Sequence, residues 1–279
     1  MAQDNLAEDN ELEASRAPLL EHLSELRNRL AIACGALLVC FLIAYPFSRW
    51  LWGFLTEPFV TALVKARGAA AAKAGIELIN TGAFGFFLVQ MKVAFFAAII
   101  GAFPVIAWQL YGFVAPGLYK RERAAALPFL ISAPFMFLAG CAFVMYVAMP
   151  FALEFALRQD VVNGAVRVKF VPRVEEYLGL LTTLALAFGL VFQMPVVSAL
   201  LGRMGVLTAS AMRKGRRYAI VGIAGFSALV TPPDIFSMMI MAAPVYVLYE
   251  ISIWLVWFIQ RARLKSEAKL AQQAGLAAP

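Results

Sequence analysis

The side chains of this sequence that could do chemistry are a few ionisable groups placed inside long apolar runs or at their ends. Glu25 precedes Arg29 by four residues, in a segment whose leucines share one helical face, so the spacing indicates an ion pair at the start of a helix. Glu122 stands among three cations in a short basic segment that follows Phe113. Both carboxylates are expected to pair with cations, and the simplest interpretation is a charge-balanced surface.

Three further polar residues, Lys92, Gln193 and Glu250, lie well inside apolar runs, where such groups are costly unless they face protein or water. The Gln193 amide is expected to hydrogen-bond to a neighbouring helix or to a passing substrate. Together the three also fit the intramembrane site of a secondary transporter or channel for a small solute, an alternative that the residues leave open. Asp234 follows paired prolines and is expected to cap the last helix.

Several function classes are excluded by what the sequence lacks. It has no phosphate-binding glycine loop, no metal-ligand spacing and only one histidine, so we expect no enzyme activity, no metal and no cofactor. The three cysteines lie inside apolar runs without pairing or ligand spacing. The net charge of +7 comes from short basic clusters between apolar runs, which favours retention at a membrane over binding of nucleic acid.

The elements that must position these side chains are membrane-spanning helices. Apolar residues make up 62% of the chain and charged residues 15%, so lipid is the solvent for most of it. Hydrocarbon offers the backbone no hydrogen-bond partners, so each apolar run of about 20 residues is predicted to be a helix. Five runs are clear, and a shorter one at residues 218–230 makes the number even. The predicted spans are residues 30–47, 84–114, 127–149, 177–201, 218–230 and 235–259.

The distribution of Lys and Arg predicts the orientation. With six spans and the N-terminus inside, the cytoplasmic segments hold 15 of these residues and the outer segments 8. In the first outer segment, residues 50–55 and 59–64 are too short to cross and carry Trp at the boundary, so they are predicted to be interfacial. The prediction is an all-α polytopic membrane protein with six transmembrane helices, both termini in the cytoplasm and interfacial helices in the first periplasmic loop. Its domains are a disordered N-tail (1–17), a helical domain (18–261) and a cytoplasmic C-tail (262–279).

Four motifs together resemble the TatC family, in its order and with its six-helix spacing, over roughly residues 18 to 261. They are His22-Leu23-x-Glu25-Leu26-Arg27-x-Arg29-Leu30, Phe113-x-Ala115-Pro116-x-Leu118-Tyr119-Lys120-x-Glu122-Arg123, Phe192-Gln193-Met194-Pro195 and Thr231-Pro232-Pro233-Asp234. The resemblance implies a receptor subunit of the twin-arginine translocase, which exports folded proteins across the bacterial inner membrane with the proton-motive force.

The resemblance also assigns roles to residues. It implies that Glu25 and Glu122 bind the arginine pair of a signal peptide, on a surface completed by Leu26, Arg27 and Phe113. Carboxylates suit this role because they accept planar, bidentate, charge-assisted hydrogen bonds from guanidinium groups.

For assembly, the resemblance implies single-span partner subunits of the TatA and TatB type, together with self-association of the chain. It matches Pro58 to a proline of the first outer loop and Asp234 to an acidic residue after the paired prolines. One departure concerns the fourth span, where many family members have Glu and this chain has Gln193, which cannot titrate.

Overall fold

The computed structural model describes the backbone of residues 2–68, 84–114, 120–158, 161–163, 166–168, 172–231 and 235–273. Side chains are described for residues 23–68, 84–113, 128–158, 172–231, 235 and 238–265. The elements in chain order are α1 (Ala2–Ala44), η1 (Tyr45–Phe47), α2 (Ser48–Leu55), α3 (Glu57–Arg67), α5 (Gly85–Val114), α6 (Lys120–Phe143), the π-helical η3 (Val144–Ala148), α7 (Met149–Leu157), β1 (Val161–Asn163), β2 (Val166–Val168), α8 (Val174–Val191), α9 (Met194–Arg203), α10 (Ala209–Val230) and α11 (Ile235–Gln273).

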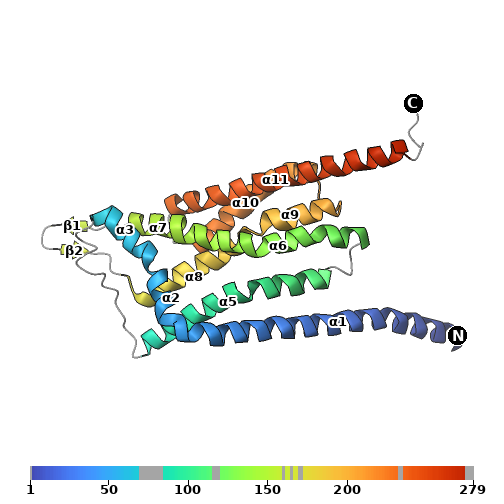
Figure 1. The fold of residues 1–279 in the computed structure, drawn as a ribbon, viewed down its shortest axis with the longest axis horizontal. Helices are drawn as coiled ribbons and strands as arrows, with labels where there is room; N and C mark the ends of the chain where they lie inside the picture. The colour runs from blue at the N-terminus through green and yellow to red at the C-terminus, as the bar shows by residue number, and fades with distance from the viewer. Residues whose placement is uncertain are drawn as a thin grey trace.

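The long helices lie side by side along the long axis of the molecule, and the start of α1 and the end of α11 lie at the same end (Figure 1). Five helical segments in the described chain are long and apolar enough to cross a membrane, and α10 is the sixth of the bundle. These crossings are α1, α5, α6 with η3 and α7, α8 with α9, α10, and α11. The predicted fold class, a six-helix polytopic protein, is therefore confirmed.

The fifth crossing is longer than predicted. We expected it to start at residue 218, whereas α10 starts at Ala209 and has 22 residues. Thr208 caps it, since the Thr208 Oγ1 accepts a hydrogen bond from the Ala211 N–H at 3.1 Å. Hydropathy missed the first turns because they are basic, yet Lys and Arg are good helix formers.

The fourth crossing is broken, which the predicted continuous helix over residues 177–201 did not include. The helix α8 ends at Val191 and α9 begins at Met194, with Pro195 in the first turn of α9. Proline has no N–H to continue the ladder of backbone hydrogen bonds, and its ring clashes with the carbonyl of the preceding turn. Gln193 therefore lies at a junction between two helices instead of within one.

Two smaller differences concern the ends of the bundle. Strands β1 and β2 form an antiparallel hairpin with Val161 opposite Val168, an exception to the all-α prediction that lies at the end away from the termini (Figure 1). The helices α1 and α11 extend into residues 2–17 and 262–273, where polar composition predicts tails. The division of the chain into tails and a helical domain stays a prediction.

The short helices α2 and α3 confirm that the segment after the first crossing forms two short elements. Each buries part of its apolar residues, with Leu55 and Phe59 at 4% and 3% exposure, whereas Trp50 is 71% exposed. The Tyr177 hydroxyl of α8 donates a hydrogen bond to the Leu55 carbonyl oxygen at 2.6 Å. Its ring meets the Phe59 ring edge-on, with centroids 5.7 Å apart. These contacts attach the two short helices to the bundle.

The helices α6 and α8 pack with their backbones in contact. A Cβ atom added to Gly140 of α6 would lie 2.7 Å from the Phe188 carbonyl oxygen and 2.8 Å from the Gly189 Cα. A Cβ added to Gly189 would lie 2.6 Å from the Phe137 ring. Glycines allow the two backbones to touch, which is how helices gain van der Waals contact in lipid.

Candidate functional site

The predicted ion pair on α1 is present. The Arg29 guanidinium donates to Oε1 of Glu25 from Nε at 3.0 Å and from Nη2 at 2.5 Å. The two side chains are half-buried, at 24% and 34% exposure. The Glu25 carboxylate therefore already binds a guanidinium group, as a receptor for arginine side chains would.

The position of Arg29 depends on a residue that the sequence did not single out. A Cβ atom at Gly112 of α5 would collide with Arg29 Nη1, so the guanidinium lies directly against the α5 backbone. Phe113, which is next in sequence, is half-buried at the same point. The contact joins α1 and α5, far apart in sequence, and no local pattern indicates it.

The other residues predicted for this surface fall into two groups. Leu26 and Arg27 are exposed on α1, Leu26 at 42%, and the neighbouring leucines of the predicted apolar face, Leu23 and Leu30, are exposed as well. Glu122 lies in the first turns of α6, but its side chain is outside the described residues. The structure thus connects Glu25 through Arg29 to Gly112, the sequence neighbour of Phe113, and the shared surface of Glu25, Phe113 and Glu122 stays a prediction.

The Gln193 amide hydrogen-bonds to a neighbouring helix, which is one of the two partners predicted for it. Its Nε2 donates to the Ala133 carbonyl oxygen of α6 at 2.9 Å, which ties the break between α8 and α9 to the third crossing. The Gln193 amide, a polar group inside the bundle, therefore has a structural function.

Lys92 has a different environment from Gln193. It is exposed on α5, where it lines a groove of about 480 Å³ between α1 and α5 together with Cys34, Phe41 and Phe95. Long basic side chains at such sites reach toward the membrane surface along apolar neighbours. Among the described contacts, nothing joins Lys92 to Gln193 or Glu250.

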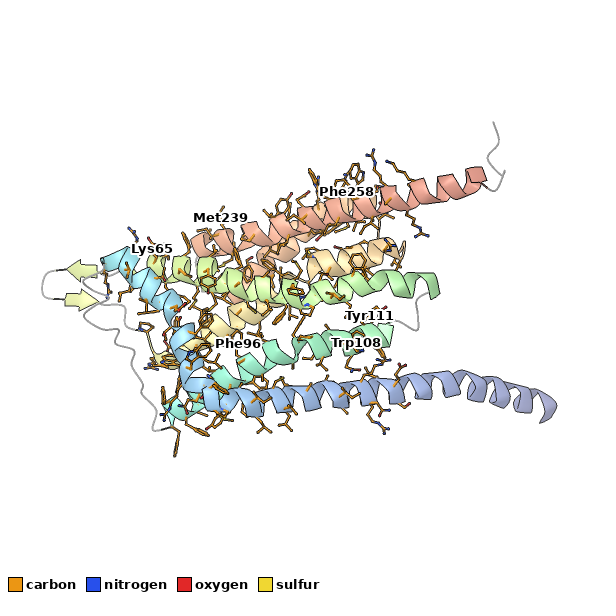
Figure 2. All side chains as sticks on the ribbon, viewed as in Figure 1. Lys65, Phe96, Trp108, Tyr111, Met239 and Phe258 are labelled. Carbon is orange, nitrogen blue, oxygen red and sulfur yellow. The ribbon has the colours of Figure 1, made fainter. Side chains whose placement is uncertain are left out.

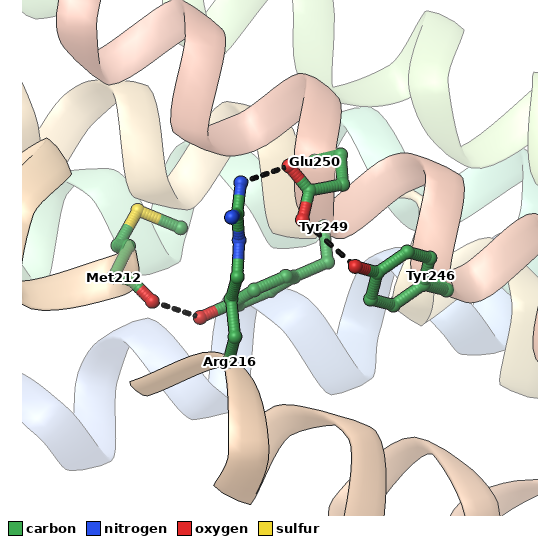
Figure 3. Close-up of polar contacts among 5 residues, drawn as sticks. All are labelled: Met212, Arg216, Tyr246, Tyr249 and Glu250. Atoms are coloured by element: carbon green, nitrogen blue, oxygen red, sulfur yellow. Dashed lines mark hydrogen bonds and ion pairs between the residues drawn. The ribbon is translucent and has the colours of Figure 1, made fainter. Parts of the chain in front are cut away.

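Glu250 of α11 forms a polar cluster with α10 (Figure 3). Its Oε2 accepts a hydrogen bond from Arg216 Nη2 at 2.7 Å, and its Oε1 accepts one from the Tyr246 hydroxyl at 3.0 Å. Next to them, the Tyr249 hydroxyl donates to the Met212 carbonyl oxygen at 2.7 Å. Lys92, Gln193 and Glu250 therefore contact three different parts of the bundle, which does not support a shared solute site.

We predict that this cluster stabilises the packing of α10 on α11. Arg216→Met leaves the Glu250 carboxylate without its cation and should lower the free energy of unfolding by about 1 kcal/mol, because the partly exposed pair is screened. The double variant Arg216→Met/Glu250→Met should recover part of that loss. Thermal unfolding in detergent measures both.

A matched control is Arg213→Met, which removes an exposed cation from the same helix. It should leave the unfolding temperature unchanged. If the double variant lost as much stability as Arg216→Met and the single variant Glu250→Met added together, the Arg216–Glu250 pair would contribute nothing.

The remaining predicted positions are Pro58 and Asp234. Pro58 is buried in the first turn of α3, where its fixed φ and missing N–H suit a helix start. Asp234 lies outside the described residues, so its predicted cap is untested. No group of three or more His, Cys, Asp or Glu residues in the described chain could hold a metal ion.

Known proteins resemble this chain in sequence and in fold. The sequence profile of TatC, the Sec-independent protein translocase protein, matches residues 21–244, which is most of the chain. This chain belongs to the TatC family. A TatC protein from Magnetococcus marinus is 38% identical over 263 residues, covering 94% of this chain and 92% of that protein. The TatCy protein from Bacillus subtilis is 34% identical, covering 92% and 95%.

Solved TatC structures agree with the fold. A crystal structure of the twin-arginine translocase receptor TatC has a TM-score of 0.69 at 31% identity and covers 84% of this chain and 97% of its own. A second crystal structure, in the detergent DDM, has a TM-score of 0.71 at 32% identity. The predicted family is therefore confirmed, and with it a component of the Sec-independent protein translocase that is a receptor and not an enzyme.

Proposed function

We propose that this TatC protein is the receptor that binds twin-arginine signal peptides at a surface made by Glu25, Phe113 and Glu122. The observation that carries the proposal is the Glu25 carboxylate, which already holds one guanidinium by two hydrogen bonds, against the α5 backbone at Gly112. Signal-peptide arginines present the same planar group, and Arg is preferred over Lys wherever two donors must align with one carboxylate. Leu26 and Arg27 complete the surface on the exposed side of α1.

The receptor works within a larger assembly of single-span subunits of the TatA and TatB type, and with further copies of itself, to export folded proteins. Its crossings lie in the bacterial inner membrane with both termini in the cytoplasm. Two observations support this orientation: the termini share one end of the bundle, and the segments at that end carry the excess of Lys and Arg. Pro58 and Asp234 serve structure or assembly.

Site-specific photo-crosslinking tests the binding surface. A photoreactive residue at position 26, which is exposed next to Glu25 and leaves both carboxylates in place, should form adducts with a precursor that carries paired arginines. The same precursor with paired lysines should form far fewer, since an ammonium cannot make the planar two-donor contact.

Position 57 is the matched control, because Glu57 is an exposed carboxylate on α3, at the opposite end of the bundle. It should form no adducts with the precursor. Equal crosslinking from position 57, or equal crosslinking of the lysine precursor, would contradict the proposed surface.

A further inference from the structure

A second groove lies at the end of the bundle away from the termini. It has a volume of about 290 Å³ and lies between α3, the η3–α7 segment and α11. Its walls are apolar and aromatic, with Phe143, Tyr146, Val147 and Phe151 among them. Lys65 and Glu154 also line it, and Lys65 lies at the end of α3 nearest the hairpin (Figure 2). The groove therefore has apolar walls and two side chains of opposite charge.

The backbone around this groove is irregular on two sides. On one side η3 is a π-helix, a wide turn that is frequent at functional sites, and Tyr146 and Val147 of η3 face the groove. On the other side Pro244 lies inside α11 and has no N–H for the carbonyl of Ile240, and both residues line the groove. Neither segment can form the regular backbone hydrogen bonds of an α-helix there. The groove therefore lies where the backbone itself is irregular.

The two charges retain capacity for a ligand. Arg158 donates both of its hydrogen bonds to Oε1 of Glu154, at 3.1 and 2.8 Å. No hydrogen bond from any described residue reaches the Glu154 Oε2. Lys65 is exposed and makes no ion pair within the described part of the chain. One carboxylate oxygen and one ammonium group are thus available along the same groove.

We propose that this groove binds a single phospholipid whose headgroup carries a phosphate and a primary ammonium, a phosphatidylethanolamine. The Lys65 ammonium holds the phosphate, and the Glu154 Oε2 accepts a hydrogen bond from the lipid ammonium. An acyl chain lies against the aromatic wall. From Glu154 to Phe143 the helix rises about 16 Å, which matches one leaflet of a hydrocarbon core about 30 Å thick.

The headgroup is the discriminating part. A choline headgroup has the positive charge but no N–H donor for Glu154, and a glycerol headgroup has no cation. A second copy of the chain or a partner helix could fill the apolar part of the groove, but neither is needed to satisfy both charges. The two charges together therefore favour the ethanolamine lipid.

Native mass spectrometry of the full chain from nanodiscs with equal amounts of ethanolamine, choline and glycerol phospholipids tests the proposal. The protein should retain one ethanolamine lipid with a preference of about tenfold, the effect of the one charge-assisted hydrogen bond to Glu154 that the other headgroups cannot make. Lys65→Gln/Glu154→Gln should reduce the preference to parity. Arg173→Gln/Glu175→Gln, at the start of α8 and outside the groove, should leave it intact.

A second variant tests the groove without removing charge. Val147 is 53% exposed, so Val147→Trp fills the groove from its open side and should displace the lipid from a folded protein. Equal retention of the three lipids by the unaltered chain, or an undiminished preference in either variant, would overturn the proposal. Crosslinking from position 147 to protein in place of lipid would do the same.

Discussion

Replacing Glu25 with lysine should weaken the binding of a twin-arginine signal peptide by roughly 10- to 150-fold. Hydrogen bonds to a charged group contribute about 1.5–3 kcal/mol, and every 1.4 kcal/mol is tenfold in affinity. The substitution removes the acceptor and places a like charge beside Arg29, which the Glu25 carboxylate otherwise holds. The measurement is binding of a labelled signal peptide to the purified chain in detergent or nanodiscs.

Two controls separate recognition from folding. Glu57→Lys makes the same charge reversal at the far end of the bundle and should leave binding unchanged. The unfolding temperature of Glu25→Lys should stay close to that of the unaltered chain, since one half-exposed ion pair contributes little to stability. Undiminished binding by Glu25→Lys combined with Glu122→Lys would show that the recognition site lies elsewhere.

Replacing Gly140 with alanine should destabilise the bundle, because the added methyl group has no space. The new Cβ would meet the carbonyl oxygen of Phe188 and the Cα of Gly189, which are backbone atoms that no rotamer change can move. The helices α6 and α8 must separate, at a cost of roughly 1–3 kcal/mol, the usual cost of overpacking. Thermal unfolding in detergent, followed by the fraction of monodisperse protein, measures the loss.

The matched variant for Gly140→Ala is Gly179→Ala in α8. No atom outside the local helix lies within 4 Å of a Cβ at Gly179, so the change should be neutral or should stabilise α8 by up to about 1 kcal/mol. An equal loss of stability in both variants would mean that the effect comes from glycine flexibility and not from the contact between α6 and α8.

The crossings could be predicted from the sequence because lipid forces every long apolar run into a helix. The departures lie where another effect dominates. Pro195 breaks a run that hydropathy reads as continuous, and the basic turns after Ala209 are helical although they are too polar to register as part of a span. The hairpin of β1 and β2 has strands of three residues, too short for a period to be visible.

The candidate site follows the same division. The Glu25–Arg29 pair could be predicted because its partners are one helical turn apart, a spacing that is visible in the sequence. The contacts of Gly112 and Arg216 could not be predicted, because they come from the packing of α1 on α5 and of α10 on α11. Opposite charges on different helices have no fixed spacing in the sequence, so only the fold identifies them as partners.

The Arg29 guanidinium occupies the Glu25 carboxylate before any ligand arrives, seated on the bare backbone at Gly112. For an arginine that comes from another chain, binding is then an exchange in which one guanidinium leaves as another enters. The affinity is the strength of the new ion pair less the few tenths of a kcal/mol that the resident i,i+4 pair contributes. A cation that gains less than this from Glu25 does not displace Arg29, so the resident pair sets a threshold that weakly fitting cations do not pass.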